Sequence, residues 1–201
     1  MKERIKAALS RTVPPPDLDL AARASLPDGS AARLFPGPLL PAAVLVPLVE
    51  RPAGLAVLLT RRTEHLREHP GQISFPGGRI DPTDQSPASA ALREAHEELG
   101  IEPSLVDVAG YLPVHAVVTG FAVLPVVGFV SPRIRLAPDP REVAEAFEVP
   151  LAFFTEPRNR HAAWRDFRGE RWPVWEYLPD GRRVWGATAH IIHSFTEIIA
   201  S

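Results

Sequence analysis

Three glutamates, Glu94, Glu97 and Glu98, stand at positions i, i+3 and i+4 of one segment of the sequence. On an α-helix this spacing places the three carboxylates on one face, where like charges repel each other. A hard divalent cation such as Mg²⁺ reverses that repulsion, because several carboxylate oxygens then share the ion. The spacing therefore indicates a metal-binding helix face. The plain alternative is an acidic face exposed to water.

Two neighbouring features favour the metal. Arg93 directly precedes the first glutamate and lies one turn from Glu97, so its guanidinium can hold a carboxylate in orientation. The loop upstream contains Gly77 and Gly78, whose missing Cβ atoms let backbone carbonyls approach a metal or a phosphate closely. A helix face that is merely exposed to water needs neither feature.

The helix that must position these carboxylates is predicted over residues 87–99. Ser86 is suited to cap its N-terminus, Pro87 to occupy the first helical position and Gly100 to end it in a left-handed conformation. An apolar stripe at helical spacing is expected to face the core. Its members are Ala88, Ala91, Leu92, Ala95 and Leu99.

Apolar runs and turn residues predict the elements around this helix. We expect a hairpin of strands 42–50 and 54–61, a short strand at 72–75, strands at 107–118 and 122–130, a helix at about 140–147, a hairpin of 173–178 with 182–186, and a final helix at 187–199. A short helix over 1–11 and an irregular Pro-rich arm precede them. The pattern predicts an α/β domain with a mixed sheet over 42–201, preceded by an arm over 1–41 whose role in dimer contacts or in covering the cleft stays open.

Composition limits the function classes. The chain has 201 residues, enough for one domain with a core, and a net charge of −2, which gives no general attraction to nucleic acid. Cysteine is absent, which excludes disulfides and thiolate metal sites. The charged start Met1–Lys6 and the lack of a long apolar run predict a cytoplasmic protein with no membrane partner.

The helical segment resembles the Nudix box of the Nudix hydrolases. That box reads Gly, five residues, Glu, seven residues, then Arg-Glu-x-x-Glu-Glu-x-Gly and an apolar residue; residues 93–101 (REAHEELGI) match its second half. The loop half departs from it. If Gly78 is the glycine of the box, the standard spacing places Asp84 at its first acidic position. If the spacing is counted back from Arg93, the acidic position falls on Gln85 and the glycine position on Arg79. The loop is therefore one residue longer than in the standard box.

The run 58–78 (LLTRRTEHLREHPGQISFPGG) is similar to the signature upstream of the box in the coenzyme A pyrophosphatase branch. That branch also tends to have a longer, Asp-rich loop, as at 81–84. Further similarity at 119–128, 142–151 and 184–189 extends the resemblance over about 42–199. It implies the Nudix fold, a mixed β-sheet sandwiched between helices.

The resemblance implies metal-assisted attack of water on a pyrophosphate, with Mg²⁺ or Mn²⁺ as cofactor. Glu94 and Glu98 are the leading metal ligands, with Glu97 as a third ligand or the base, and the Gly78 carbonyl as an additional ligand. Arg93 is the orienting residue. Some Nudix enzymes use an acid from a distant loop, and the candidates here are Glu142, Glu145 and Glu148; the alternative is that these are exposed or capping acids of the predicted helix 140–147.

The implied substrate is coenzyme A or a derivative, cleaved to 3′,5′-ADP and 4′-phosphopantetheine. The densest basic cluster of the sequence would recognise its phosphates, and the strand that enters the Gly-Gly turn would line the cleft. The predicted substrate-binding residues are Arg61, Arg62, Arg67, His69, Gln72, Ser74 and Phe75, with His65 in the same cluster. Thr119–Phe121 would contact the ligand or form a plain turn.

Several alternatives remain open. The chain could instead hydrolyse ADP-ribose, NADH or another nucleoside diphosphate derivative, or be a binding module without catalysis. A homodimer is a further hypothesis. His96 is interpreted as pointing away from the carboxylates, and Trp164, Trp172, Trp175 and Trp185 as packing residues rather than a stacking platform.

Overall fold

A mixed β-sheet forms the centre of the protein in the computed structural model, which describes residues 1–26, 30–66, 68–167 and 169–200. Its main path runs β3-β2-β1-β7-β5. These strands are β1 (Leu40–Arg51), β2 (Gly54–Arg62), β3 (Ile73–Ser74), β5 (Val106–Tyr111) and β7 (Phe121–Val130). β1 and β7 are parallel, and β2 turns back on β1 as the predicted hairpin.

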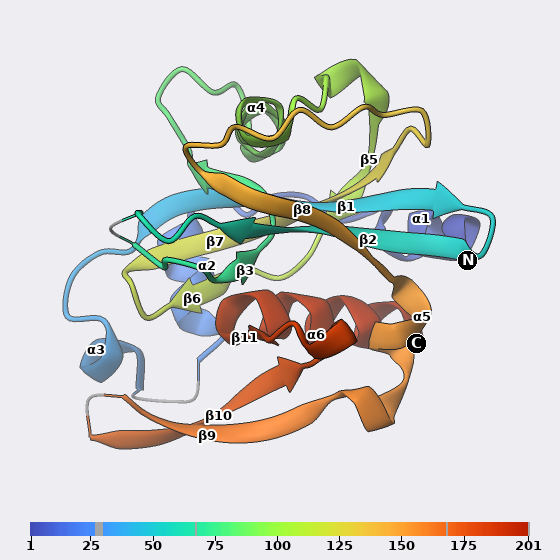
Figure 1. Cartoon of the computed structure of the whole chain (residues 1–201). Coiled ribbons are helices and arrows are strands. Elements are labelled where there is room, and N and C mark those ends of the chain that lie inside the picture. Colours follow the sequence, from blue (N-terminus) through green and yellow to red (C-terminus); the bar gives the residue numbers. More distant parts are fainter. Residues whose placement is uncertain (27–29, 67, 168, 201) are drawn as a thin grey trace.

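Three shorter strands extend this sheet. β4 (Gly77–Arg79) pairs with β1, β6 (His115–Val117) with β7, and β8 (Val143–Pro150) with β2. Helix α4 (Pro87–Leu99) covers one face of the sheet, and α6 (Gly186–Ala200) lies on the other (Figure 1). The predicted mixed sheet between helices is confirmed.

A second sheet lies beyond α6 (Figure 1). It has the order β11-β10-β9, with β9 (His161–Phe167), β10 (Glu170–Tyr177) and β11 (Val184–Trp185). The pairing of β10 with β11 confirms the predicted hairpin. The sequence did not indicate β9, which has few buried side chains and so lacks an apolar alternation.

Helix α4 begins and ends as its capping residues predict. The Ser86 hydroxyl accepts a hydrogen bond from the Ser89 N–H, and Gly100 ends the helix at a φ of 68°. Its core face is made of small side chains, which bring the helix close to the sheet. The buried residues are Ala90, Ala91, Ala95, Glu98 and Leu99, so the stripe is rotated slightly from the predicted one and one carboxylate lies inside it.

The predicted helix at 140–147 is wrong. Residues Val143–Pro150 form β8, which pairs antiparallel with β2 from Ala56↔Pro150 to Arg62↔Val143. Val143 and Val149 are buried. The backbone hydrogen bonds of this distant strand outweigh the helix propensity of alanine and glutamate, which is a weak preference.

Other boundaries differ in detail. The predicted strand at 107–118 is divided at Pro113 into β5 and β6, because proline cannot donate to a ladder. The arm contains two helices, α2 (Leu18–Ala24) and α3 (Ser30–Leu34), and α1 spans Lys2–Leu9. The remaining elements are α5 (Leu151–Thr155) and 3₁₀ turns at Pro103–Leu105, Pro157–Asn159 and Pro179–Gly181.

The N-terminal helices contribute to the core. Ile5 and Leu9 of α1 are buried in the cluster that also holds Phe195 and Ile199 of α6. Leu18 of α2 is buried in a second cluster beside β7. Among the described residues no helix is both long and apolar enough to span a membrane.

Candidate active site

A cleft of about 550 Å³ opens between the carboxylate face of α4 and the first turn of α6. This volume is typical of sites for small molecules. One wall is acidic and includes Glu94, Glu98 and Glu142. The opposite end is largely apolar, with Val117, Phe121, Val123, Trp185, Ala187 and Ile191.

Glu98 is the most buried carboxylate of this wall. Its side chain is held in the core face of α4, and the residue is 5% exposed. Burial raises the pKa of Glu98 to about 8, although the Gly77 N–H at 3.5 Å and the charge of Arg62 act in the opposite direction. Burial likewise raises the pKa of Glu94, and the charges of Glu97 and Glu142 add to the effect. For both carboxylates, burial outweighs the nearby positive charge, which is that of Arg62 for Glu98 and that of Arg93 for Glu94.

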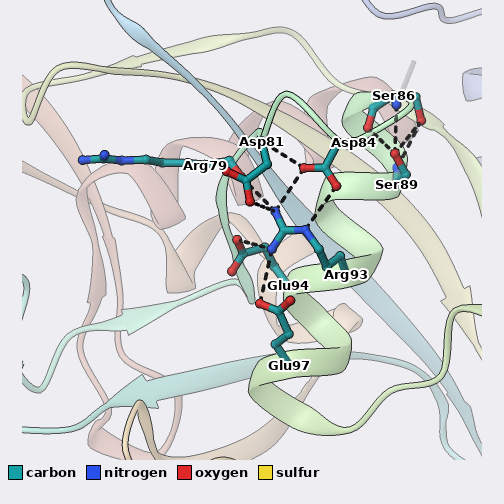
Figure 2. A network of polar contacts seen from close by, with 8 residues as sticks. All are labelled: Arg79, Asp81, Asp84, Ser86, Ser89, Arg93, Glu94 and Glu97. Atoms are coloured by element: carbon teal, nitrogen blue, oxygen red, sulfur yellow. Dashed lines mark hydrogen bonds and ion pairs between the residues drawn. The ribbon is translucent and has the colours of Figure 1, made fainter.

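Arg93 holds the loop and the helix together, as Figure 2 shows. Its guanidinium donates to both carboxylate oxygens of Asp84 at 3.1 and 3.0 Å and to the Arg79 carbonyl at 3.1 Å. It also reaches Glu94 at 2.9 Å and Glu97 at 3.2 Å. The predicted orienting role of Arg93 thus has a geometric basis in this network.

The same network identifies the acid of the loop. The sequence left open whether Asp84 or Gln85 occupies the first acidic position of the box. Asp84 faces Arg93 with a 6% exposed side chain, whereas Gln85 is exposed. The bidentate contact with Arg93 lowers the pKa of Asp84 and keeps it ionised. The extra loop residue is accommodated before the helix starts.

Gly78 lies against the Glu94 carboxylate. A Cβ atom at this position would be 2.6 Å from Glu94 Cδ, which is closer than van der Waals contact allows. A side chain at this position would displace the Glu94 carboxylate, so glycine lets the backbone of β4 pass close beside this acid. The predicted proximity of Gly78 to the metal ligands agrees with this close approach.

Of the three distant acids, the structure brings only Glu142 into the cleft. It lies in the turn before β8, and its carbonyl accepts a hydrogen bond from the Thr63 N–H at 3.0 Å. Glu145 instead binds Arg61 and Arg182, and Glu148 binds Arg51. The helix predicted to carry these acids does not form, and Glu145 and Glu148 lie in β8 instead.

The residues of the basic cluster are likewise split between the cleft and other parts of the surface. Arg62 lines the cleft, and its Nε atom is buried without a hydrogen-bond partner among the described residues. Arg61 points to the other face of β2, where it is paired with Glu145, so its predicted contact with substrate is not supported by its position. His65 Nε2 lies 3.0 Å from the Arg141 carbonyl, outside the cleft lining. Arg67 lies outside the described residues.

The remaining predicted binding residues all line the cleft. His69 Nδ1 lies 3.0 Å from Gln72 Oε1, which fixes the two side chains against each other. The Ser74 hydroxyl is 3.2 Å from that of Thr60, and Phe75 is 3% exposed, so most of its ring belongs to the core. Glu97 is outside the lining, because its 57% exposed side chain turns toward Arg93.

The acidic wall fits a divalent cation. Buried Glu98 and half-buried Glu94 line the cleft together with Glu142, which repels both, and an ion would replace this repulsion by attraction. Within the described ranges, no three acidic or histidine side chains already converge tightly enough to hold one ion.

Comparison with known proteins identifies the family. The model of the NUDIX domain matches residues 39–166, which include the sheet, α4 and the cleft acids. The chain belongs to the Nudix family. It is therefore an enzyme of the Nudix hydrolase type, consistent with a pyrophosphohydrolase.

Nudix relatives in bacteria are similar over most of this chain. The protein named Uncharacterized Nudix hydrolase NudL from Enterobacter sp. (strain 638) is 46% identical over 151 residues, which are 75% of this chain and 78% of the relative. NudL of Escherichia coli (strain K12) has the same identity and coverage.

Solved Nudix structures share the fold. A MutT/nudix family protein from Enterococcus faecalis has a TM-score of 0.52 and 18% identity, over 81% of this chain and 63% of that one. DR0079 from Deinococcus radiodurans has a TM-score of 0.50 and 13% identity, over 77% of this chain and 81% of that one.

Sequence reasoning missed several members of the cleft, among them Arg79 and Thr188. Arg79 directly follows the Gly-Gly pair, and Thr188 donates from its hydroxyl to the Ile73 carbonyl at 3.0 Å, joining α6 to β3. Trp185 lines the cleft, a position that its predicted packing role did not include. For Arg79, the one feature of the sequence that could have indicated a place in the cleft is its position directly after the Gly-Gly pair. Nothing in the sequence indicated that the start of α6 would meet this strand.

Proposed function

We propose that this enzyme hydrolyses the pyrophosphate bond of coenzyme A or its acyl derivatives. The products would be 3′,5′-ADP and 4′-phosphopantetheine or its acyl form, and Mg²⁺ or Mn²⁺ would be the cofactor. A homodimer and a cytoplasmic location stay predictions.

The observation that carries the proposal is the position of the 58–78 signature. Its members Arg62, His69, Gln72 and Ser74 line the same cleft as Glu94 and Glu98. The residues that distinguish the coenzyme A branch are therefore next to the chemistry rather than elsewhere on the surface. A long cleft with an acidic wall and an apolar end also suits a substrate that has a charged centre and an uncharged arm.

Each residue then has a proposed task. Glu94 and Glu98 would hold the metal ions, which neutralise charge on the phosphate oxygens and activate water. Glu142 faces the acidic wall from a separate turn and would accept the proton of the attacking water. Arg93 would position Glu94 and Glu97, and Arg62 would bind a pyrophosphate oxygen beside Glu98.

A substrate panel tests the substrate. Initial rates with coenzyme A, acetyl-coenzyme A, NADH and ADP-ribose should give the highest kcat/KM for one of the first two, and only in the presence of Mg²⁺ or Mn²⁺. A clear preference for ADP-ribose would overturn the assignment.

A substitution at Glu98 tests its proposed role as a metal ligand. Glu98→Gln should lower metal-dependent kcat/KM by at least about 100-fold, because loss of even an outer-shell partner of a metal ligand costs about 10–100-fold. Glu102→Gln is the matched control, since the Glu102 carboxylate pairs with the exposed His96 outside the cleft lining. Full activity of Glu98→Gln would show that Glu98 is not a ligand.

A further inference from the structure

Arg79 differs from most arginines near the cleft in having no acidic partner. Arg93 contacts four acids, and Arg61 and Arg182 share Glu145. Arg79 is exposed and lines the cleft, and no carboxylate of the described residues lies within ion-pair distance of its guanidinium. An arginine that lines a cleft without a counter-charge is available to an anionic ligand.

The register of β4 places this side chain away from the acidic wall. Gly78 pairs with Ala43, which packs with the alanines of α4, whereas Arg79 pairs with Ala42, which packs in the cluster of α6. Successive residues of a strand point to opposite faces, so Arg79 leaves the sheet on the α6 side. Figure 2 shows its side chain extending away from the Arg93 network.

An aromatic ring holds the guanidinium in place. Arg79 Cζ lies 5.4 Å from the centroid of the Phe121 ring, at the start of β7. A guanidinium that lies over an aromatic ring keeps its N–H groups free to donate to a ligand. A planar, oriented fork of donors suits the oxygens of a phosphate.

Two cleft arginines thus lie in different places. The charge of Arg62 acts on Glu98 at the acidic wall, where the pyrophosphate would bind. Arg79 lies on the other face of the sheet edge, beside the apolar end formed by Val117 and Phe121. A substrate with a phosphate apart from its pyrophosphate would engage both.

We propose that Arg79, stacked on Phe121, is a specificity residue for a phosphate outside the pyrophosphate. In coenzyme A this group is the 3′-phosphate of the adenosine, and that identity rests on the proposed function. The predicted phosphate-binding role of Arg61 passes to Arg79, because Arg61 is paired with Glu145.

The test compares two nucleotides that differ only in this phosphate. Calorimetric titration of the full chain with adenosine 3′,5′-bisphosphate and with adenosine 5′-monophosphate, both with Mg²⁺, should show tighter binding of the bisphosphate. Arg79→Gln should weaken the bisphosphate by about tenfold or more and the monophosphate by less than about twofold. Arg79→Lys should retain part of the preference, because it keeps the charge but not the planar fork.

Arg135→Gln is the control, because Arg135 is an exposed arginine outside the cleft. Thermal unfolding of each variant shows that the fold is kept. Equal weakening of both nucleotides would assign Arg79 to the shared 5′-phosphate and overturn the proposal, as would an unchanged preference or a parent protein that does not discriminate. Discrimination in binding without hydrolysis of coenzyme A would instead refute the proposed function alone.

Discussion

At the residue scale, the Glu98 carboxyl group is buried with little hydrogen bonding, so either a proton or a cation must offset its charge. Its only hydrogen-bond donor among the described residues is the Gly77 N–H at 3.5 Å, which is a weak contact. Glu94 and Glu142 add repulsion, which Arg62 partly offsets. In the absence of metal the protonated form is therefore favoured, and binding of a divalent ion would release this proton.

The raised pKa of Glu98 predicts how the metal-free protein responds to pH. Its folded pKa of about 8 exceeds the ordinary value of 4.5, so between these values the folded state binds more protons than the unfolded state. Stability then falls as pH rises through this window, by roughly 2–4 kcal/mol in total. Urea unfolding in EDTA at pH 5.5 and pH 8 should show this loss.

Glu98→Gln isolates the effect, because it leaves all other titrating groups in place. Among these, burial lowers the pKa of His115 to about 4, which makes the protein gain stability as pH rises toward 6.5. The variant should keep that gain and lose the decline at higher pH. An identical decline in parent and variant would mean that Glu98 is ionised in the folded, metal-free protein.

At the element scale, one ion-pair network joins the loop at 81–84 to helix α4. The Asp84 carboxylate accepts two hydrogen bonds from Arg93 and one from the Asp81 N–H at 2.8 Å. Arg93 in turn holds Glu94 and Glu97. The loop thereby sets the orientation of the helix carboxylates without entering the lining of the cleft.

Asp84→Asn should lower kcat/KM by about tenfold, since outer partners of metal ligands contribute about 10–100-fold. It should also lower the free energy of unfolding by about 1–2 kcal/mol, the range for hydrogen bonds to charged groups. Gln85→Asn is the control, because the exposed Gln85 should tolerate the change. Steady-state kinetics and urea unfolding measure both effects. A larger loss in Gln85→Asn than in Asp84→Asn would reverse the assignment of the loop acid.

Helix α4 could be predicted from the sequence and β8 could not, for a physical reason. The signals for α4 are local: Ser86 and Gly100 cap the same segment whose apolar spacing defines its face. β8 depends on pairing with β2, which is distant in the sequence, and no local pattern specifies that contact.

The same distinction applies to the candidate site. The pattern of Glu94 and Glu98 follows from helix geometry, and it could be interpreted directly. The separation of Arg62 from Arg61 depends on which side of β2 each faces, and the entry of Glu142 depends on the path of the chain before β8. Arg79 acquires its surroundings from Phe121, on another strand. These assignments required the three-dimensional structure.

At the scale of the whole molecule, the cleft joins parts of the chain that lie far apart in sequence. The main sheet supplies β3, β4 and the turn between β6 and β7, one flanking helix supplies the carboxylates, and the other supplies Ala187 and Thr188. Whatever shifts α6 relative to the sheet therefore changes the apolar end of the cleft. Helix α1 packs against β5 and against Phe195 and Ile199 near the other end of α6, away from the first turn that lines the cleft.

The N-terminal helix should therefore stabilise the entire fold although the sequence suggested a separate arm. Leu9 is 1% exposed and shares a core cluster with Phe195 and Ile199, and the Arg4 guanidinium donates to the Ile199 carbonyl. Leu9→Ala should lower the free energy of unfolding by about 2–5 kcal/mol, the usual cost of a large cavity in a core. Chemical denaturation measures this loss.

Val13→Ala is the matched control, because Val13 is 78% exposed and its truncation should change stability by less than about 0.5 kcal/mol. Since α1 does not line the cleft, Leu9→Ala should leave KM unchanged at temperatures where the variant is folded. Removal of residues 1–11 should destabilise the protein in the same direction and more strongly, because it deletes both Ile5 and Leu9. If the truncated chain unfolds at the same denaturant concentration as the parent, then α1 is an appendage and the core of the enzyme begins after it.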